Sequence, residues 1–223
     1  MNILVAGANG NTGRQIVGLL VEDNHHVRAM VREASQGDEF EELGAEPVVA
    51  DLENDINFAV MGCDAVIFAA GSGADTGTDK TIAVDRDGAI KLIEACEANA
   101  VNRFIMLSAV GTDNPENGPD KLKTYLEAKA EADKKLKKSN LNYTIFKAVS
   151  LTDDAETGKI TARKKLDDST GEISRADVAA AIVEALDNEN TYRKSIEIAA
   201  GNTPIGGALS SFDLTDNLIN NKS

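Results

Sequence analysis

Residues 2–32, NILVAGANGNTGRQIVGLLVEDNHHVRAMVR, are the stretch that decides the fold of this chain. The apolar run at 3–6 predicts a buried strand, and it leads directly into the glycine-rich sequence GANGNTG at 7–13. An amphipathic segment with apolar residues at helical spacing follows, and a second strand is predicted at 26–31. Strand, glycine-rich turn, helix and strand in this order are typical of the unit that binds a dinucleotide.

Each glycine of this turn has a physical task. Gly7 allows a tight turn, Gly10 lets the backbone approach a pyrophosphate, and Gly13 lets the helix pack closely against the strand. The free N–H groups at the start of the helix then face the phosphate charge. A glycine-rich turn of some other α/β protein is the alternative, and the order of the surrounding elements favours the dinucleotide site.

The end of the second strand bears on which dinucleotide is bound. An acidic side chain at this position accepts hydrogen bonds from the ribose hydroxyls of NAD, whereas an arginine can hold the 2′-phosphate of NADP. The strand ends in Arg32, which favours NADP. Glu33 stands next to it and keeps NAD open as the less favoured alternative.

The composition is that of one large domain with an acidic surface. The chain has 223 residues, 42% of them hydrophobic, and its 23 Lys and Arg against 37 Asp and Glu give a net charge of −14. This charge disfavours nucleic acid and anionic membrane surfaces as partners. A cofactor phosphate can still be held by local backbone dipoles and one or two cations. We therefore expect a small-molecule substrate and a monomer or homodimer.

Targeting, redox and metal signals are weak. Met1-Asn2 leads straight into a core strand, so we expect no signal peptide and a cytoplasmic protein. No apolar run approaches the length that crosses a bilayer. Cys63 and Cys96 lie in apolar contexts and are predicted to be buried thiols, not a disulfide pair. Cys and His are not clustered at metal-ligand spacing, so we expect no metal site.

Strand and helix patterns alternate along most of the chain. Strands are predicted at 2–6, 26–31, 46–50, 64–69, 102–107, 142–147 and 194–199, and helices at 12–22, 35–43, 54–60, 79–99, 120–138 and 174–188. This alternation predicts an α/β fold: a doubly wound parallel sheet of the Rossmann type, with seven strands in the order 3-2-1-4-5-6-7 and helices on both faces. We expect one NAD(P)-binding domain over residues 1–205 and a short tail over 206–223.

In such a sheet the ligand crevice lies beyond the carboxyl ends of the strands. Two long segments with little regular pattern, 109–120 and 148–172, follow strands at that end. Long irregular segments in a compact domain are usually functional or mobile. We expect these two segments to form the walls of a substrate cleft.

A tyrosine and a lysine on the predicted helix 120–138 are candidates for acid/base chemistry. Tyr125 and Lys129 are four residues apart and so share one face of the helix. A phenol has an unperturbed pKa of about 10, and a neighbouring ammonium group favours the phenolate and lowers that pKa. Tyr125 could then exchange a proton with a substrate oxygen while hydride moves at a nicotinamide. The alternative is a chance pair on a lysine-rich helix.

The order of motifs along the chain resembles that of the atypical short-chain dehydrogenases/reductases, in the branch related to extended nucleotide-sugar epimerases and NmrA-like NAD(P)-binding proteins. The resemblance covers nearly the whole chain, to about residue 205. Its motifs are GANGNTG at 7–13, DTGTDKTIAVDRDGAIKLIEAC at 75–96, RFIMLSAVG at 103–111, YLEAK at 125–129, LNYTIFKAVSLTDD at 141–154 and ISRADVAAAIVEAL at 173–186.

This resemblance implies roles for the matching residues, most of them in cofactor binding. The pyrophosphate would be held by Gly7, Asn9, Gly10, Asn11, Thr12 and Gly13, and the 2′-phosphate by Arg32. The adenine would be bordered by Asp51 and Leu52, and the riboses by Ala69, Ala70 and Gly71. In catalysis Tyr125 would be the acid/base, Lys129 would lower its pKa and bind the nicotinamide ribose, Ser108 would orient the substrate oxygen, and Asp85 would belong to the proton relay.

Three positions depart from the family's pattern. Asp85 stands where active members often have Asn, the catalytic serine position can fall on Ala109 in place of Ser108, and 147–149 reads Lys-Ala-Val where the family often has Arg-Pro-Gly. The resemblance implies an NADP-dependent oxidoreductase or epimerase-like enzyme for a small carbonyl or alcohol substrate. The departures keep open a non-catalytic NAD(P)-binding sensor. A flavin or quinone reductase, which needs little acid/base help, is the third possibility.

Overall fold

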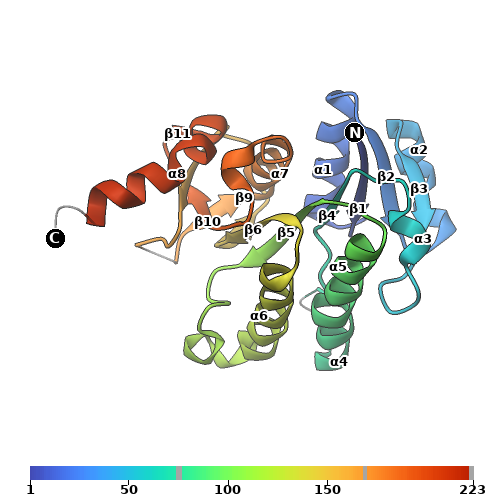
Figure 1. Ribbon diagram of the computed structural model, residues 1–223, viewed down its shortest axis with the longest axis horizontal. Coiled ribbons are helices and arrows are strands. Elements are labelled where there is room, and N and C mark those ends of the chain that lie inside the picture. Colours follow the sequence, from blue (N-terminus) through green and yellow to red (C-terminus); the bar gives the residue numbers. More distant parts are fainter. Residues whose placement is uncertain (74–76, 168–169, 221–223) are drawn as a thin grey trace.

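The chain folds into a doubly wound sheet with helices on both faces, as the sequence predicts (Figure 1). The computed structural model describes residues 1–73, 77–167 and 170–220, with side chains up to residue 212. Residues 75–76 of one family motif, 168–169 of one expected cleft wall and 221–223 of the expected tail lie outside the described residues.

The seven predicted strands are present and neighbour one another in the predicted order. The main sheet has nine strands, ordered β3-β2-β1-β4-β5-β6-β10-β8-β11, and the first seven are parallel. Those seven are β1 (Asn2–Ala6), β2 (His26–Val31), β3 (Glu46–Val49), β4 (Ala65–Phe68), β5 (Arg103–Ala109), β6 (Asn142–Ala148) and β10 (Lys194–Ala200). Two antiparallel strands, β8 (Lys159–Arg163) and β11 (Thr203–Pro204), extend the edge, so the expected seven strands become nine.

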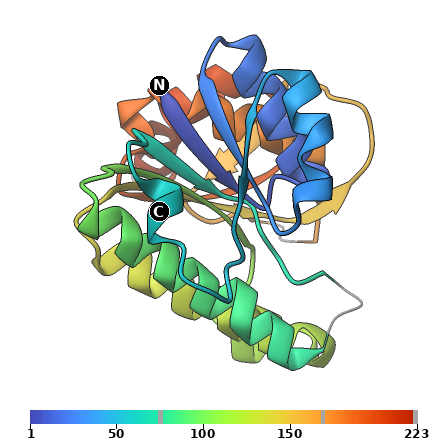
Figure 2. The same ribbon diagram turned by 90° about the vertical axis from the view of Figure 1, so that its right-hand side faces the viewer.

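Helices cover both faces of the sheet (Figure 2). On one face, α1 (Asn11–Glu22), α2 (Asp38–Leu43), α7 (Arg175–Glu184) and the start of α8 (Ile205–Asn220) bury apolar side chains in a shared core. On the other face, α3 (Asn57–Val60), α5 (Ala89–Ala98) and α6 (Lys123–Lys138) do the same. Successive strand residues alternate between the two cores, which is why the strands are apolar throughout.

The predicted helix at 79–99 has an unusual middle. It consists of α4 (Thr78–Lys80), the π-helical segment η2 (Thr81–Gly88) and α5. In a π-helix each N–H bonds to the carbonyl five residues earlier, and this wider form occurs often at functional sites. At Gly88 a Cβ atom would lie 2.8 Å from the Cβ of Leu52, so the helix packs directly against the loop that follows β3.

Two regions are more regular than the sequence suggests. Within 148–172 lie β7 (Ser150–Thr152) and β8, and β8 belongs to the main sheet, so this segment is not a single irregular loop. β7 pairs with β9 (Glu172–Ser174) in a small second sheet. The expected tail at 206–223 begins inside α8, whose Leu209 and Phe212 are buried in the core, so the domain does not end at residue 205.

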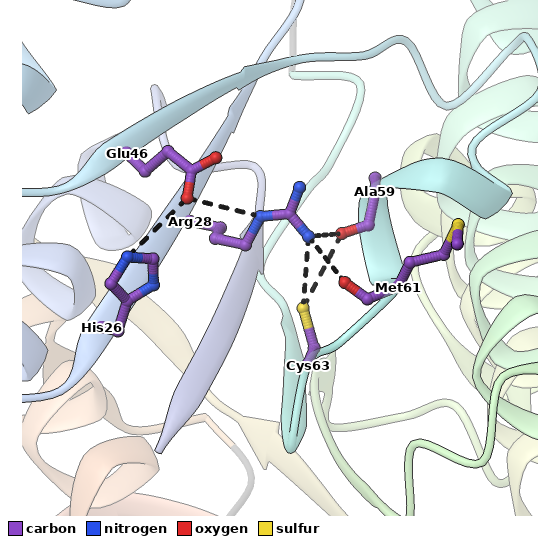
Figure 3. Close-up of polar contacts among 6 residues, drawn as sticks. All are labelled: His26, Arg28, Glu46, Ala59, Met61 and Cys63. Carbon is purple, nitrogen blue, oxygen red and sulfur yellow. Dashed lines mark hydrogen bonds and ion pairs between the residues drawn. The ribbon is translucent and has the colours of Figure 1, made fainter.

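A charged side chain ties the end of the sheet that lies opposite the expected crevice to α3 (Figure 3). Arg28 of β2 donates from Nη1 to the carbonyl oxygens of Ala59 at 2.8 Å and Met61 at 3.1 Å, and it contacts the sulfur of Cys63 at 3.7 Å. Its Nε lies 3.8 Å from Oε2 of Glu46 on β3. These contacts join β2, β3 and the end of α3 into one brace.

Candidate functional site

The turn after β1 brings backbone segments unusually close together. Gly7 has φ +87°, and a Cβ there would lie 2.5 Å from the backbone nitrogen of Ala70. A Cβ on Gly13 would lie 2.1 Å from the carbonyl oxygen of Gly7, so α1 begins directly against the turn. Only residues without a side chain fit at these two positions.

The start of α1 is left open to an anion. Its N-cap residue is Gly10, which has no side chain to accept a hydrogen bond from the first helical turn, and no acidic residue lies in that turn. Arg14 holds the turn from behind: its Nε donates to the carbonyl of Asn9 at 3.2 Å, and it also bonds the side-chain oxygen of Asn9 and pairs with Glu39. The arrangement suits a phosphate at the helix N-terminus.

A cavity of about 310 Å³ opens at the carboxyl ends of β1 to β4 and contains most of the predicted cofactor residues. The predicted residues that line it are Gly7, Asn9, Gly10, Arg32, Asp51, Leu52, Ala69, Ala70 and Gly71. Of the other four, Thr12 and Gly13 are buried in the first turn of α1, Asn11 is exposed there, and Lys129 lies on α6. The sequence reasoning missed other lining residues, among them Gln36, Glu53, Lys80 and Val84. The last two could have been inferred, because the predicted helix after the fourth strand starts at this edge.

The two charged residues after β2 have different surroundings. Glu33 is the N-cap of the short helix η1 (Ala34–Gln36), and its carboxylate accepts from the backbone of Gln36. The side chain of Gln36 in turn accepts from the backbone nitrogens of Arg32 at 3.0 Å and Glu33 at 3.2 Å. Arg32 lines the cavity, and within the described part of the chain its guanidinium forms no ion pair. Of the two, only Arg32 lines the cavity.

The predicted acid/base pair is linked to this cavity through Ala70, one of its lining residues. Tyr125 is half-buried on α6, and Lys129 is 3% exposed one turn further along. The Nζ of Lys129 lies 5.9 Å from the centre of the Tyr125 ring and donates to the carbonyl of Ala70, a cavity residue, at 3.1 Å. It also donates to the carbonyl of Leu107 at 3.3 Å. These bonds fix the ammonium group where the cofactor cavity meets α6.

Asp85 is the counter-ion of Lys129. It lies on η2, is fully buried, and its Oδ1 is 3.3 Å from the Nζ of Lys129, while its Oδ2 accepts from the backbone nitrogen of Ser72 at 3.0 Å. Burial alone would lower the pKa of Lys129, but Tyr125, Asp85 and Asp133 outweigh it and raise that pKa. Lys129 is therefore held as a cation.

Ser108 is placed differently from its predicted role. It is buried at the end of β5, and its hydroxyl donates to Oδ2 of Asp133 on α6 at 3.0 Å. In this structure its hydroxyl proton is thus engaged inside the protein. Ala109, the alternative position, ends β5 and has no hydroxyl to offer. The partner Asp133 is more than twenty residues from Ser108, so no local signal could reveal it.

The two expected cleft walls differ in character. The segment 109–120 leaves β5 at its carboxyl end and contains one short 3₁₀ helix, Pro115–Asn117, with a second beginning at Asp120. In the other segment, Asp177 of α7 anchors the turn before β8 by accepting from the backbone nitrogens of Thr157 at 3.0 Å and Gly158 at 2.8 Å. Of the two segments, only 109–120 remains a candidate cleft wall that consists mostly of loop.

A second cavity, of about 690 Å³, lies away from the carboxyl ends of the first strands, against the ends of α1 and α7. Its lining is acidic, with Asp23, Glu184, Asp187 and Glu189.

Across the described ranges, His, Cys, Asp and Glu form no group suited to a metal ion. None of the helices described is both long and apolar enough to cross a membrane.

Comparison with known proteins identifies close relatives over almost the full length. A sequence profile of the family described as NAD(P)H-binding matches residues 7–189. A Bacillus subtilis protein named uncharacterized sugar epimerase YhfK is 45% identical over 94% of this chain and 99% of its own. A yeast protein, UPF0659 protein YMR090W of Saccharomyces cerevisiae, is 35% identical over 92% of this chain and 96% of its own.

Solved structures are likewise similar to this chain over almost its full length. A Bacillus halodurans protein, named provisionally as an NAD-dependent epimerase/dehydratase, has 44% identity and a TM-score of 0.92, covering 95% of this chain and 99% of its own. The oxidoreductase ylbE from Lactococcus lactis has 31% identity and a TM-score of 0.86, covering 96% and 97%.

Proposed function

The chain belongs to the NAD(P)H-binding family, among the atypical short-chain dehydrogenases/reductases, and on this premise we propose that it is an NADP-dependent oxidoreductase or epimerase-like enzyme acting on a small carbonyl or alcohol substrate. The observation that carries the proposal is the bond from the Lys129 ammonium to the carbonyl of Ala70. This bond connects the face of α6 that carries Tyr125 to Ala70, a residue that lines the cavity.

The residues around the cavity fit a dinucleotide. The close approach at Gly7 and Gly13 leaves room for a diphosphate against the open N-terminus of α1. Asp51 and Leu52 would border the adenine, and Ala70 and its neighbours the riboses. When bound, the nicotinamide supplies hydride to, or accepts it from, a substrate carbon.

Arg32 supports NADP over NAD. Arg32 lines the cavity and its guanidinium has no ion-pair partner in the described residues, whereas the carboxylate of Glu33 is engaged as a helix cap. A guanidinium can bind a phosphate through two parallel hydrogen bonds. Glu33, the acidic residue after β2 that would favour NAD, thus has its carboxylate engaged within the protein.

Tyr125 is the proposed acid/base. It would hold or release the proton of the substrate oxygen, and the buried Lys129 cation below it would stabilise the charge that develops. Lys129 is fixed by two carbonyls and by Asp85, so this charge is preorganised.

The test of the catalytic role is Tyr125→Phe, with Tyr143→Phe as a matched control. Tyr143 lies on β6, outside the site. With NADPH and a panel of aldehydes, ketones and sugars, we expect Tyr125→Phe to lower kcat by about 10²- to 10⁴-fold, because general acid/base catalysis contributes that much. NADPH affinity, measured by fluorescence titration, should stay within about threefold of the wild type. Full turnover in Tyr125→Phe contradicts the acid/base assignment.

The cofactor assignment is tested by Arg32→Ala. We expect NADPH affinity to fall about tenfold while NADH affinity changes little, because the lost bonds are charge-assisted but solvent-exposed. Lys159→Ala, a change of an exposed lysine on β8, is the control. An unchanged ratio of NADPH to NADH affinity contradicts the role of Arg32.

A flavin or quinone reductase is the second candidate, favoured by the engaged hydroxyl of Ser108. Transfer of hydride to such an acceptor needs little acid/base help. Activity with flavin mononucleotide or menadione that survives Tyr125→Phe would support this candidate over the first.

A further inference from the structure

A second buried charged cluster lies one helical turn beyond Lys129, and the proposed chemistry does not use it. Asp133 of α6 is 2% exposed, and its Oδ2 accepts from the hydroxyls of Ser108 and Thr112, both at 3.0 Å. The Nζ of Lys147, on β6, lies 3.9 Å from the same oxygen. One carboxylate therefore joins α6 to the ends of β5 and β6.

The sheet register explains how these groups meet. Ser108 and Lys147 are paired residues on neighbouring strands, so their side chains lie on the same face, the one that α6 covers. The other carboxylate oxygen of Asp133, Oδ1, is buried and has no hydrogen-bond partner among the described residues. Such a group costs stability, and burial raises the pKa of Asp133 despite the nearby Lys147. Stability alone is therefore a poor reason for a charge here.

The cluster also holds the start of the segment 109–120. Thr112 is tied to Asp133, and the next residue, Asp113, places its Oδ1 2.5 Å from the Nζ of Lys147 and 3.6 Å from that of Lys137. Although part-burial would raise the pKa of Asp113, the two lysines lower it. The first residues of the expected cleft wall are thus held by the buried Asp133 and by an ion pair between the buried Lys147 and the exposed Asp113.

We propose that Asp133, with Lys147, is a positioning residue of the active site. It fixes the start of the 109–120 segment, and the ends of β5 and β6, relative to the turn of α6 that carries Tyr125 and Lys129. Ser108 serves the same purpose through its bond to Asp133. The proposal rests on the proposed function, because it concerns the geometry around Tyr125.

The charge of Asp133 has an effect that shape alone would not have. Asp133 helps to raise the pKa of Lys129, so its neutralisation lowers that pKa. The groups that face Lys129 are Tyr125 and Asp133 from α6, Asp85 from η2, and the carbonyls of Ala70 and Leu107. The charged groups that face Asp133 are Lys147 from β6 and Lys129 and Lys137 from α6.

Asp133→Asn isolates this charge. The amide oxygen of asparagine can accept from both hydroxyls, and its NH₂ group takes the place of the unpartnered oxygen, so the charge is lost while both hydroxyl bonds and the shape are kept. Glu127→Gln, on the exposed side of the same helix, is the control. The assay measures kcat, KM for NADPH and the pH profile with a carbonyl substrate found for the wild type.

We expect Asp133→Asn to lower kcat by roughly tenfold to a hundredfold, the loss that follows small misplacement, with KM for NADPH within about twofold. The alkaline limb of the pH profile should move to lower pH, and Glu127→Gln should show neither effect. Unchanged kcat and an unchanged profile in Asp133→Asn overturn the proposal.

Amide hydrogen exchange tests the same proposal without turnover. In Asp133→Asn, and in Lys147→Met as a second variant, exchange should accelerate at 108–113 and 123–129 and not elsewhere in the sheet. If the wild type turns over no substrate, the proposed function fails, and exchange still decides the positioning. If Asp133→Asn does not fold, Lys147→Met decides, and exchange equal to that of the wild type overturns the proposal.

Discussion

Replacing Asp85 by Asn should destabilise the protein strongly at neutral pH. Asp85 is fully buried with its Oδ1 3.3 Å from the ammonium of Lys129, which is itself 3% exposed. The asparagine can still accept from the backbone of Ser72, so the main change is a buried cation that has lost its counter-ion. Removing one partner of such a pair costs about 3–5 kcal/mol.

The destabilisation by Asp85→Asn has an upper limit, because Lys129 can lose its proton and so avoid being a buried cation without a counter-ion. The ordinary pKa of lysine is 10.5, and each unit below it costs about 1.4 kcal/mol. Deprotonation at pH 7 therefore costs about 5 kcal/mol, and at pH 9 only about 2 kcal/mol. For a chain of 223 residues, a loss of 3–5 kcal/mol lowers Tm by about 6–11 °C.

The direction of the pH dependence distinguishes the loss of a counter-ion from a simple packing defect. In the wild type the folded-state pKa of Lys129 is raised above 10.5. The protonated Lys129 therefore contributes its full stabilisation below pH 10.5, and this contribution is lost as the pH rises through the folded-state pKa. In Asp85→Asn burial prevails and the folded-state pKa falls below the unfolded one. The deficit of the variant should then shrink as the pH rises from 7 towards 10.5.

The assay is urea unfolding at pH 7 and at pH 9, followed by circular dichroism, with thermal melts beside it. Glu94→Gln is the control, because Glu94 and Lys135 link α5 and α6 at 2.7 Å but are exposed to solvent. It should cost less than about 1 kcal/mol at both pH values. A deficit under about 1 kcal/mol for Asp85→Asn at pH 7, or one that is equal at both pH values, would refute the reasoning.

Three further outcomes follow from the packing. Gly13→Ala places a methyl group 2.1 Å from the carbonyl oxygen of Gly7 and should weaken NADPH binding at least tenfold in a fluorescence titration. In the control, Gly18→Ala, the methyl group meets nothing within 4 Å. This variant should bind NADPH normally, and its free energy of unfolding in urea should rise by up to about 1 kcal/mol. Arg28→Met removes bonds to two carbonyls and should cost about 2–3 kcal/mol, with faster amide exchange in α3 than in α5; equal exchange in the two helices contradicts the brace. Burial raises the pKa of Cys63 and of Cys96, so Ellman's reagent at pH 8 should label neither thiol until urea unfolds the chain, and rapid labelling of the folded protein would contradict their burial.

The local parts of the site were predictable because their signals are local. The positive φ of Gly7 and the tight contact at Gly13 follow from a turn that must join a strand to a helix within seven residues, and only glycine permits it. Arg32 was found by its place at the end of β2. The spacing of Tyr125 and Lys129 is one turn of α6, so their common face was also predictable.

The partners of these residues were not predictable, because they come from distant segments. The pairing of Lys129 with Asp85 joins α6 to the π-helical segment η2, and that of Ser108 with Asp133 joins α6 to the end of β5. Strand β8 was not predicted, because it is a short strand in a segment with little regular pattern and it pairs antiparallel to β10 and β11, which are distant from it in the sequence. A serine placed by motif order to orient a substrate instead bonds a buried carboxylate.

The amino-acid sequence by itself determined the order of strands and helices, the glycine turn and the face that carries Tyr125 and Lys129. These depend on periodicity and on backbone sterics, which act over a few neighbouring residues. The tertiary structure alone decided which carboxylate neutralises each buried lysine and that the hydroxyl of Ser108 bonds Asp133. Those choices depend on how helices pack across the sheet, because the free energy of a buried charge is set by the groups that surround it in space.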